Sequence, residues 1–264
     1  MGKISFLQRV VNLFFTPSKA FDGLTDGVSY KDWLYPLIII TVAMIILPLF
    51  FRDISINEAE ERFIRIERSI SNNPDVPEER LEQMNAGMQE AREKIADSRE
   101  NPFAFRNLWG YLLIPVGYFI STAFFSAILL LVGNFGMGGK VKFFQMFTMV
   151  IMTYLISGNG FLMNMAPGIG TLELLIKTPL IVIKESTDMI LSPGLLFDEI
   201  DSYLAYFLNQ LDVFRIWGMV VMGFGFAKLY NKPSSSGIIA VAMPWLILVA
   251  IGAALVKANS LMMG

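Results

Sequence analysis

The sequence predicts an all-α protein: a polytopic membrane helix bundle of about five spans, with an extramembrane antiparallel helical hairpin between the first and second spans. Two features of the composition support this prediction. Hydrophobic residues make up 54% of the 264 residues and charged residues only 17%, whereas a soluble domain carries about 25% charged residues. The charge is also concentrated, because residues 52–107 contain 22 of the 44 charged side chains. Most of the remaining chain is therefore apolar enough to lie in lipid.

Residues 1–32 are expected to form a cytoplasmic amphipathic segment. Within residues 3–15, four apolar residues recur at helical spacing, namely Ile4, Leu7, Val11 and Phe14. Thr16 and Pro17 then fit the N-cap and the first position of a second short helix over residues 18–24. The first helix is expected either to lie on the membrane surface or to pack against the bundle as an ordinary element, and the sequence favours neither.

Five apolar stretches approach or exceed the roughly 20 residues that a helix needs to cross the hydrocarbon core. They predict spans over residues 33–51, 111–133, 144–166, 213–230 and 237–256, the last four within a membrane bundle that covers residues 108–264. The fourth stretch has the weakest signal, because Asp212 and Arg215 lie at or inside its edge. A charge inside a span is costly unless it is paired or lies near the membrane surface.

Polar residues near the third and fourth spans are candidates for lining an intramembrane cavity, namely Asn159, Asn164, Asp212 and Arg215. Asp212 and Arg215 are three positions apart, so they share a helix face and can neutralise each other. They also fit an interfacial ion pair that sets the depth of the helix. Residues 157–160 (Ser-Gly-Asn-Gly) and Asn164 fit close helix packing as well as a broken helix that lines a cavity.

The charged segment of residues 52–107 predicts the helical hairpin. Two seams step by three and four residues on either side of a proline-containing turn at residues 72–77: Ile56, Ala59, Phe63, Ile66 and Ile70, then Leu81, Met84, Met88, Ala91 and Ile95. The hairpin is either self-contained, with charges that keep it soluble, or a docking arm for a partner. In the second case the candidate partner-binding residues are Phe63, Ile66, Ile70, Leu81, Met84, Met88 and Ile95.

Residues 167–184 contain a further apolar run with Glu173 and Lys177 spaced by four, an arrangement that favours a helix. This segment fits either a re-entrant element or a helix lying at the membrane surface, and the sequence does not separate the two.

The distribution of basic residues predicts a cytoplasmic N-terminus and an extracytoplasmic C-terminus. With that orientation the cytoplasmic segments carry eight Lys and Arg against three Asp. Residues 167–212, on the opposite side, carry two basic and seven acidic residues. The hairpin at residues 52–107 is then extracytoplasmic.

Composition argues against several functional classes. With no His and no Cys, the chain lacks the usual ligands of structural zinc and the Cys–His or Ser–His pairs of nucleophilic enzymes. We therefore expect no catalytic residues, no metal site and no cofactor. A net charge of −2 argues against nucleic acid as a partner, because nucleic-acid binding needs a basic face.

The order of short motifs resembles the Yip domain family (Ypt/Rab-interacting membrane proteins), in its bacterial branch. The residues that carry the resemblance lie before the first span and at the start of the fourth: Pro17, Phe21, Trp33, Asp212, Phe214 and Trp217. The resemblance implies five spans with the orientation that the basic residues predict. Eukaryotic members act in membrane traffic and bind Rab-type GTPases through a longer cytoplasmic region. This chain has about 32 residues before its first span, so Rab binding is not expected. Some bacterial relatives look like accessory subunits of efflux-type ABC transporters.

These observations favour a non-enzymatic, multi-pass subunit of a bacterial inner membrane that binds membrane or periplasmic proteins, with an ABC transporter or envelope complex among the candidates. Membrane lipid is an expected partner, and the sequence leaves a homo-oligomer open. The alternative is a small transporter or lipid-handling protein that uses the polar cavity near Asn159, Asn164, Asp212 and Arg215.

Overall fold

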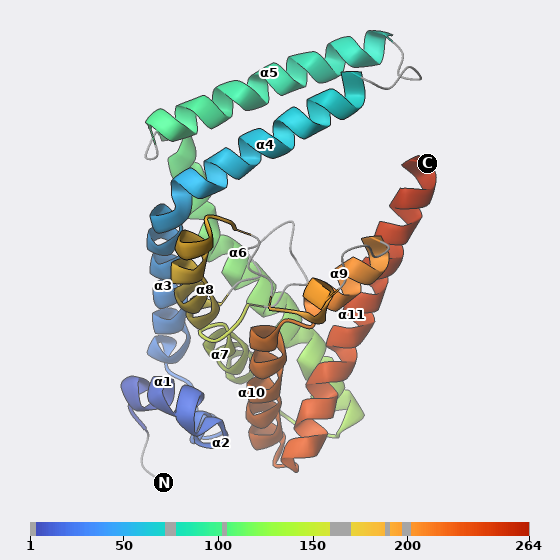
Figure 1. Ribbon diagram of the computed structural model, residues 1–264. Coiled ribbons are helices and arrows are strands. Elements are labelled where there is room, and N and C mark those ends of the chain that lie inside the picture. Colours follow the sequence, from blue (N-terminus) through green and yellow to red (C-terminus); the bar gives the residue numbers. More distant parts are fainter. Residues whose placement is uncertain are drawn as a thin grey trace. The chain divides into compact units, whose positions relative to one another are not determined.

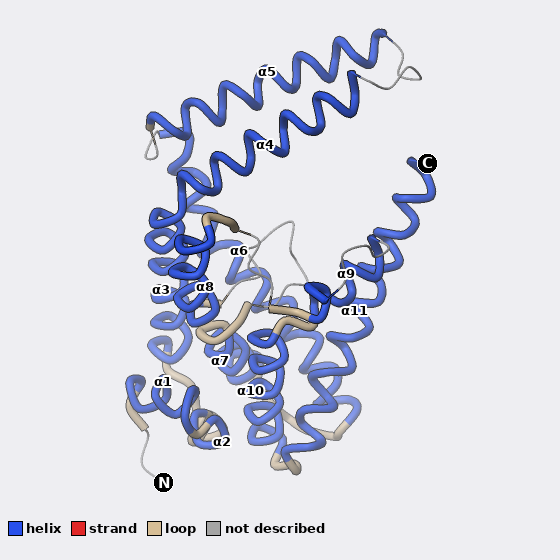
Figure 2. Tube along the Cα trace, viewed as in Figure 1, coloured by secondary structure: helices blue, strands red, loops and turns tan. Residues whose placement is uncertain are grey.

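The computed structural model describes residues 4–71, 78–101, 105–158, 170–187, 191–196 and 202–263. Within these ranges every regular element is a helix (Figure 2), which confirms the predicted all-α fold. Four of the helical stretches described contain an apolar segment long enough to cross a membrane: Tyr30–Arg68, Trp109–Gly136, Val213–Tyr230 and Ser234–Ala258. In the first of them the apolar segment is α3, which precedes the charged helix α4. The chain is a multi-pass membrane helix bundle.

The chain divides into two compact units, one made of Met1–Met44, Ile114–Leu175 and Ile190–Gly264 and the other of Ile45–Leu113 and Ile176–Met189. We call them the bundle unit and the hairpin unit. The bundle unit contains α1 (Phe6–Phe15), α2 (Pro17–Ala20), most of α3 (Tyr30–Ile46) and of α6 (Phe105–Leu130), the π-helix η2 (Leu131–Gly136), α7 (Phe143–Thr153), the start of α8 (Thr171–Lys184), η4 (Pro193–Leu196), α9 (Ser202–Gln210), α10 (Val213–Tyr230) and α11 (Ser234–Met263). The hairpin unit contains η1 (Leu47–Phe51), α4 (Arg52–Ser71) and α5 (Glu78–Glu100), with the adjoining ends of α3, α6 and α8 (Figure 1).

Helix α7 forms the core of the bundle unit. Its residues 146–153 are all buried, on every side of the helix, as expected for a helix that is apolar all round. Phe147 is fully buried, with the rings of Phe119, Trp33 and Phe143 centred 5.0, 5.9 and 5.8 Å from its own. This aromatic cluster joins α7 to α3 and α6.

Glycines allow α10 to approach its neighbours closely. A Cβ atom built on Gly237 of α11 would lie 2.2 Å from the carbonyl oxygen of Gly223 in α10, well inside van der Waals contact. On another face of α10, a Cβ on Gly225 would lie 2.5 Å from Met149 of α7. The glycines of the fourth predicted span therefore serve close helix packing, as small residues commonly do in membranes.

The predicted third span, residues 144–166, is not one continuous helix. Helix α7 ends at Thr153 after 11 residues, about half the length that a bilayer core requires. The physical reason is a mutual capping arrangement: the amides of Thr171 and Leu172, at the start of α8, donate to the carbonyls of Tyr154 and Leu155 at 3.2 and 2.9 Å. Helix ends normally leave such groups unpaired, so the two ends satisfy each other at the break. Residues 159–166 lie outside the described residues.

Candidate functional site

The first candidate site is the hairpin of α4 and α5, which lie side by side (Figure 1). Arg92 of α5 pairs with Glu67 of α4 at 2.6 Å, and Arg99 pairs with Glu60 at 3.2 Å. Arg99 also donates to the Asn57 side chain at 2.7 Å. The end of α5 thus faces the start of α4, which confirms the predicted antiparallel hairpin.

The seam of α5 follows the prediction, but that of α4 is rotated. Met88, Ala91 and Ile95 of α5 are half-buried. On α4 the half-buried positions facing α5 include Glu60, Phe63 and Glu67, whereas the predicted seam residues Ala59 and Ile66 are exposed. The rotation places Glu60 and Glu67 opposite Arg99 and Arg92, with which they pair. The side chains of Ile70, Leu81 and Met84 lie outside the described residues.

One side of the hairpin carries a groove of about 290 Å³, which we call the hairpin groove. Its lining residues come from both helices: Glu60, Phe63, Ile64, Arg92 and Ile95. The Arg92 guanidinium lies 5.7 Å from the centre of the Phe63 ring, within range of a cation–π attraction. Ile64 is 41% exposed. The groove therefore combines an apolar floor with one acidic and one basic rim residue.

A carboxylate fastens the base of the hairpin to the segment that follows α8. Glu58 accepts hydrogen bonds from the Thr187 hydroxyl, from the Thr187 amide at 2.8 Å and from the Ser186 hydroxyl at 2.9 Å. Arg62 lies 3.6 Å from the same carboxylate. These contacts, the Thr187 hydroxyl first among them, hold the pKa of Glu58 below its ordinary value of 4.5 despite an opposing effect of burial. The ionised carboxylate is thus the form that makes the contact.

The contact should weaken when pH falls through the lowered pKa of Glu58. A carboxylate whose folded pKa is depressed contributes stability above its unfolded pKa and loses it as the folded state takes up the proton. We expect Glu58→Ala to reduce hydrogen-exchange protection of the Thr187 amide by roughly fivefold, the equivalent of about 1 kcal/mol for one net hydrogen bond. Protection corrected for intrinsic exchange should fall below pH 4.5 in the wild type only. Glu61→Ala, on an exposed position of α4, is the control. Equal protection in wild type and Glu58→Ala at neutral pH would exclude this role.

The second candidate site is the predicted polar cavity, and the structure gives Asp212 a different task. Asp212 is 2% exposed and forms the N-cap of α10, accepting from the amide of Phe214 at 2.9 Å. Its other oxygen accepts from the amide of Leu191 at 3.1 Å. Unpaired amides at a helix start attract a carboxylate, so Asp212 closes the junction between α10 and the segment before η4.

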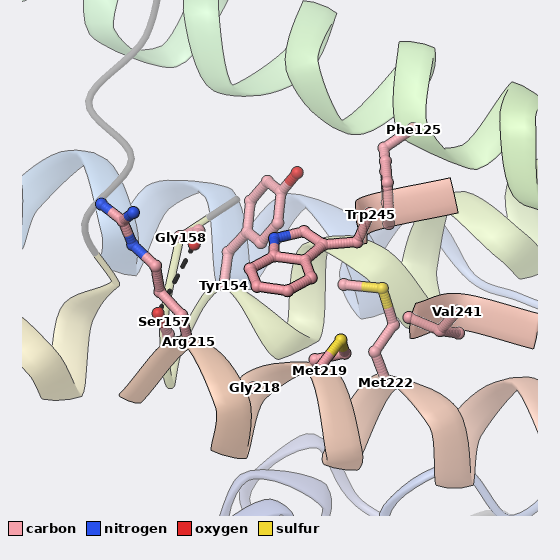
Figure 3. Close-up of a pocket in the computed structure, with 10 residues that line it drawn as sticks. All are labelled: Phe125, Tyr154, Ser157, Gly158, Arg215, Gly218, Met219, Met222, Val241 and Trp245. Carbon is pink, nitrogen blue, oxygen red and sulfur yellow. Dashed lines mark hydrogen bonds between the residues drawn. The ribbon is translucent and has the colours of Figure 1, made fainter. Parts of the chain in front are cut away.

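Arg215 lines a small cavity of the bundle unit, whereas Asp212 is not among its lining residues. Figure 3 shows Arg215 on one side of Ser157 and Tyr154, with the Trp245 ring beside Tyr154. Arg215 also donates to the Gln210 side chain. The cavity offers about 20 Å³ to the centres of water molecules, which is room for about one water. Asn159 and Asn164 lie outside the described residues, so their part in a cavity stays a prediction.

Sequence reasoning missed a buried carboxylate beside this cavity. Glu173, considered from the sequence only for its helical spacing to Lys177, is 1% exposed. It accepts from the Ser157 hydroxyl at 3.0 Å and from the Gly170 amide at 3.3 Å. Its position in the first turn of α8, where a helix start favours negative charge, is the signal that could have indicated this. Glu173 therefore stabilises the break between α7 and α8.

Among the residues that the structure describes, no three His, Cys, Asp or Glu side chains lie close enough to hold a metal ion together. In comparisons with known proteins, the model of the Yip1 domain family matches residues 11–256. No curated protein and no solved structure matches the chain. The family match covers the hairpin, α10 and α11 as far as residue 256, so it extends over both units.

Proposed function

This chain belongs to the Yip1 domain family, and on that premise we propose that it is a non-catalytic, multi-pass membrane protein whose α4–α5 hairpin binds a partner protein. The observation that carries the proposal is the hairpin groove, where Phe63, Ile64 and Ile95 form an apolar floor between Glu60 and Arg92. Apolar side chains lining a concavity between two otherwise charged helices offer a surface that a partner's apolar side chains can cover.

The chemistry of the groove suggests an amphipathic helix as the partner segment. In a hairpin of only two helices, the residues where the helices meet stay partly accessible to solvent. Phe63, Met88 and Ile95 are examples, because each is half-buried. A third helix lying along the groove would bury these side chains in the manner of helix-in-groove recognition. Glu60 and Arg92, which pair with Arg99 and Glu67 within the hairpin, would then lie beside the polar edge of that helix.

The distribution of charge supports an extracytoplasmic position for the hairpin, in a bacterial inner membrane. Lysines gather between α6 and α7 and around the end of α10, namely Lys140 and Lys142, then Lys228 in the last turn of α10 and Lys232 just after it. Cytoplasmic loops are enriched in such residues. The partner would then be a membrane or periplasmic protein, and a subunit of an efflux-type ABC transporter or envelope complex is the candidate that the family resemblance favours.

The proposal predicts position-specific cross-linking. A photoreactive amino acid at residue 64, which lines the groove, should form an adduct with the partner in intact membranes. The same amino acid at residue 65, exposed on the other side of α4, is the matched control and should give an adduct yield several-fold lower. Deletion of residues 57–100 should abolish recovery of the same partner in mild detergent.

Two outcomes would contradict the proposal. One is an equal yield of adducts at residues 64 and 65, which would indicate random collision. The other is undiminished recovery of the partner by a correctly inserted chain that lacks residues 57–100. Labelling of a cysteine placed at residue 75 from outside the cell tests the orientation separately, so a wrong orientation can be distinguished from a wrong interface.

The rival function, a small transporter or lipid-handling protein, has weaker support. The cavity beside Arg215 has room for about one water, and Asp212 is engaged by two backbone amides. Solute flux in proteoliposomes that disappears in Arg215→Gln would favour the rival. Arg215 is the better choice for this test, because removing Asp212 also removes the cap of α10.

A further inference from the structure

Helix α1 has one face that is buried in the bundle unit and an opposite face that is exposed. One face packs into the bundle unit through Arg9 and Leu13, which are 2% and 0% exposed. The other face exposes large apolar side chains, with Leu7 72%, Val11 44% and Phe15 80% exposed. We call these three residues the α1 ridge. At about 100° per residue, the ridge and the buried face point in directions about 180° apart, so the ridge faces directly away from the protein.

The contacts of α1 place it where α3 enters the membrane. The Arg9 guanidinium donates to the carbonyl of Ala20 at 3.0 Å and lies 3.8 Å from Asp32, in the first turn of α3. The Phe6 ring packs edge-on against Tyr35, with centroids 5.3 Å apart. Helix α3 begins at Tyr30 and belongs to an apolar, membrane-crossing stretch. Helix α1 therefore lies at the level of the boundary between lipid and water, beside the start of α3 (Figure 1).

The same end of the bundle unit is rich in exposed lysines. Contacts tie its segments together: Lys228 pairs with Asp22 at 2.6 Å, and Gln145 donates to the carbonyl of Leu24 at 2.9 Å. The lysines of these segments are Lys19, Lys31, Lys140, Lys142, Lys228 and Lys232, against the acidic residues Asp22, Asp26 and Asp32. An excess of lysines at a membrane surface attracts anionic headgroups.

We propose that α1 is a lipid-binding helix, whose ridge of Leu7, Val11 and Phe15 inserts into the headgroup–acyl boundary of an anionic leaflet. An interfacial helix buries its apolar face about 5–10 Å into that boundary, and the contacts of Arg9 fix the orientation of α1 on the bundle unit, with the ridge on the opposite face. The two readings of this helix from the sequence are then compatible, because one face packs on protein and the other on lipid.

The chain contains no cysteine, so single-cysteine variants test the proposal without further changes. An environment-sensitive fluorophore would be attached to Val11→Cys, on the ridge, or to Asp26→Cys, an exposed position of the same unit. The full chain would be reconstituted in phosphatidylcholine vesicles with and without phosphatidylglycerol, both containing a lipid with a shallow nitroxide quencher. We expect a shorter emission wavelength and several-fold stronger quenching at residue 11 than at residue 26, with quenching at residue 11 stronger in the anionic vesicles.

Other outcomes would overturn the proposal or part of it. Equal emission and quenching at residues 11 and 26 would place the ridge in water. A disulfide formed readily between two Val11→Cys chains would assign the ridge to a second copy of the protein. Equal quenching at residue 11 in both kinds of vesicle would remove the preference for anionic lipid.

Discussion

We expect a Gly237→Leu variant to unfold in mild detergent at a temperature about 10 °C below that of the wild type. A Cβ atom at this position would lie 2.2 Å from the carbonyl oxygen of Gly223 and 2.7 Å from the amide nitrogen of Ala227. Both are backbone atoms, so the clash is relieved only if α10 and α11 move apart. Overpacking costs about 1–3 kcal/mol and occasionally more, and we expect the upper end here. For a chain of this size, about 3 kcal/mol corresponds to a shift of roughly 10 °C in Tm. Circular dichroism at 222 nm during heating would measure it.

Gly110→Leu provides the matched control for this variant. Gly110 lies in α6, and a Cβ atom there would meet nothing within 4 Å. The same substitution should therefore change the free energy of unfolding by less than about 0.5 kcal/mol. If both leucine variants lost the same amount of stability, the loss would reflect glycine replacement in general, and the close crossing of α10 and α11 would not explain it.

Removing the Phe147 side chain should destabilise the bundle by about 3–5 kcal/mol, the usual range for a buried Phe→Ala change. Phe147 is 0% exposed, and its ring lies against Phe119 at 5.0 Å and Trp33 at 5.9 Å. Its loss leaves a cavity that a close-packed helix crossing cannot fill by relaxation. The expected result is a large drop in Tm, with oligomers or aggregates on size-exclusion chromatography after mild heating.

Phe135→Ala is the control for the aromatic cluster. Phe135 lies in the π-helix η2 and is 83% exposed, so no protein cavity forms when its ring is removed. Its Tm in detergent should stay within a few degrees of the wild type, since surface substitutions usually change stability by less than about 0.5 kcal/mol. A Phe147→Ala variant as stable as Phe135→Ala would show that α7 does not organise the core.

The sequence was sufficient to predict the helices that stand out by apolar length. Helices α3, α6, α10 and α11 overlap four of the predicted spans. Hydropathy could not reveal that α7 stops at Thr153. The mean hydropathy of a sequence window does not depend on which distant residues donate hydrogen bonds to the carbonyls at a helix end. The carbonyls of Tyr154 and Leu155 find their donors in residues 171 and 172, on the far side of a segment that the sequence predicted as span.

The spacing of apolar residues also predicted the half-buried face of α5 better than that of α4. The predicted seam of α5 matches the half-buried Met88, Ala91 and Ile95. On α4, Glu60 and Glu67 face α5 and pair with its arginines, and Ile66 is exposed. The spacing of apolar residues shows which of them share a helix face. It does not show which face the other helix of the hairpin covers. Asp212 illustrates the same limit, since its spacing to Arg215 suggested an ion pair while its carboxylate caps α10.

The central helix α7 has a consequence for how the protein is made. At 11 residues it is about 16 Å long, roughly half the thickness of the hydrocarbon layer, so α7 by itself is too short to cross that layer. The surface of α7 that meets Gly225 of α10 at Met149 is covered only after some seventy more residues have left the ribosome. We therefore expect α7 to complete its packing only after α10 has been synthesised, and a chain truncated before α10 to leave this surface of α7 uncovered.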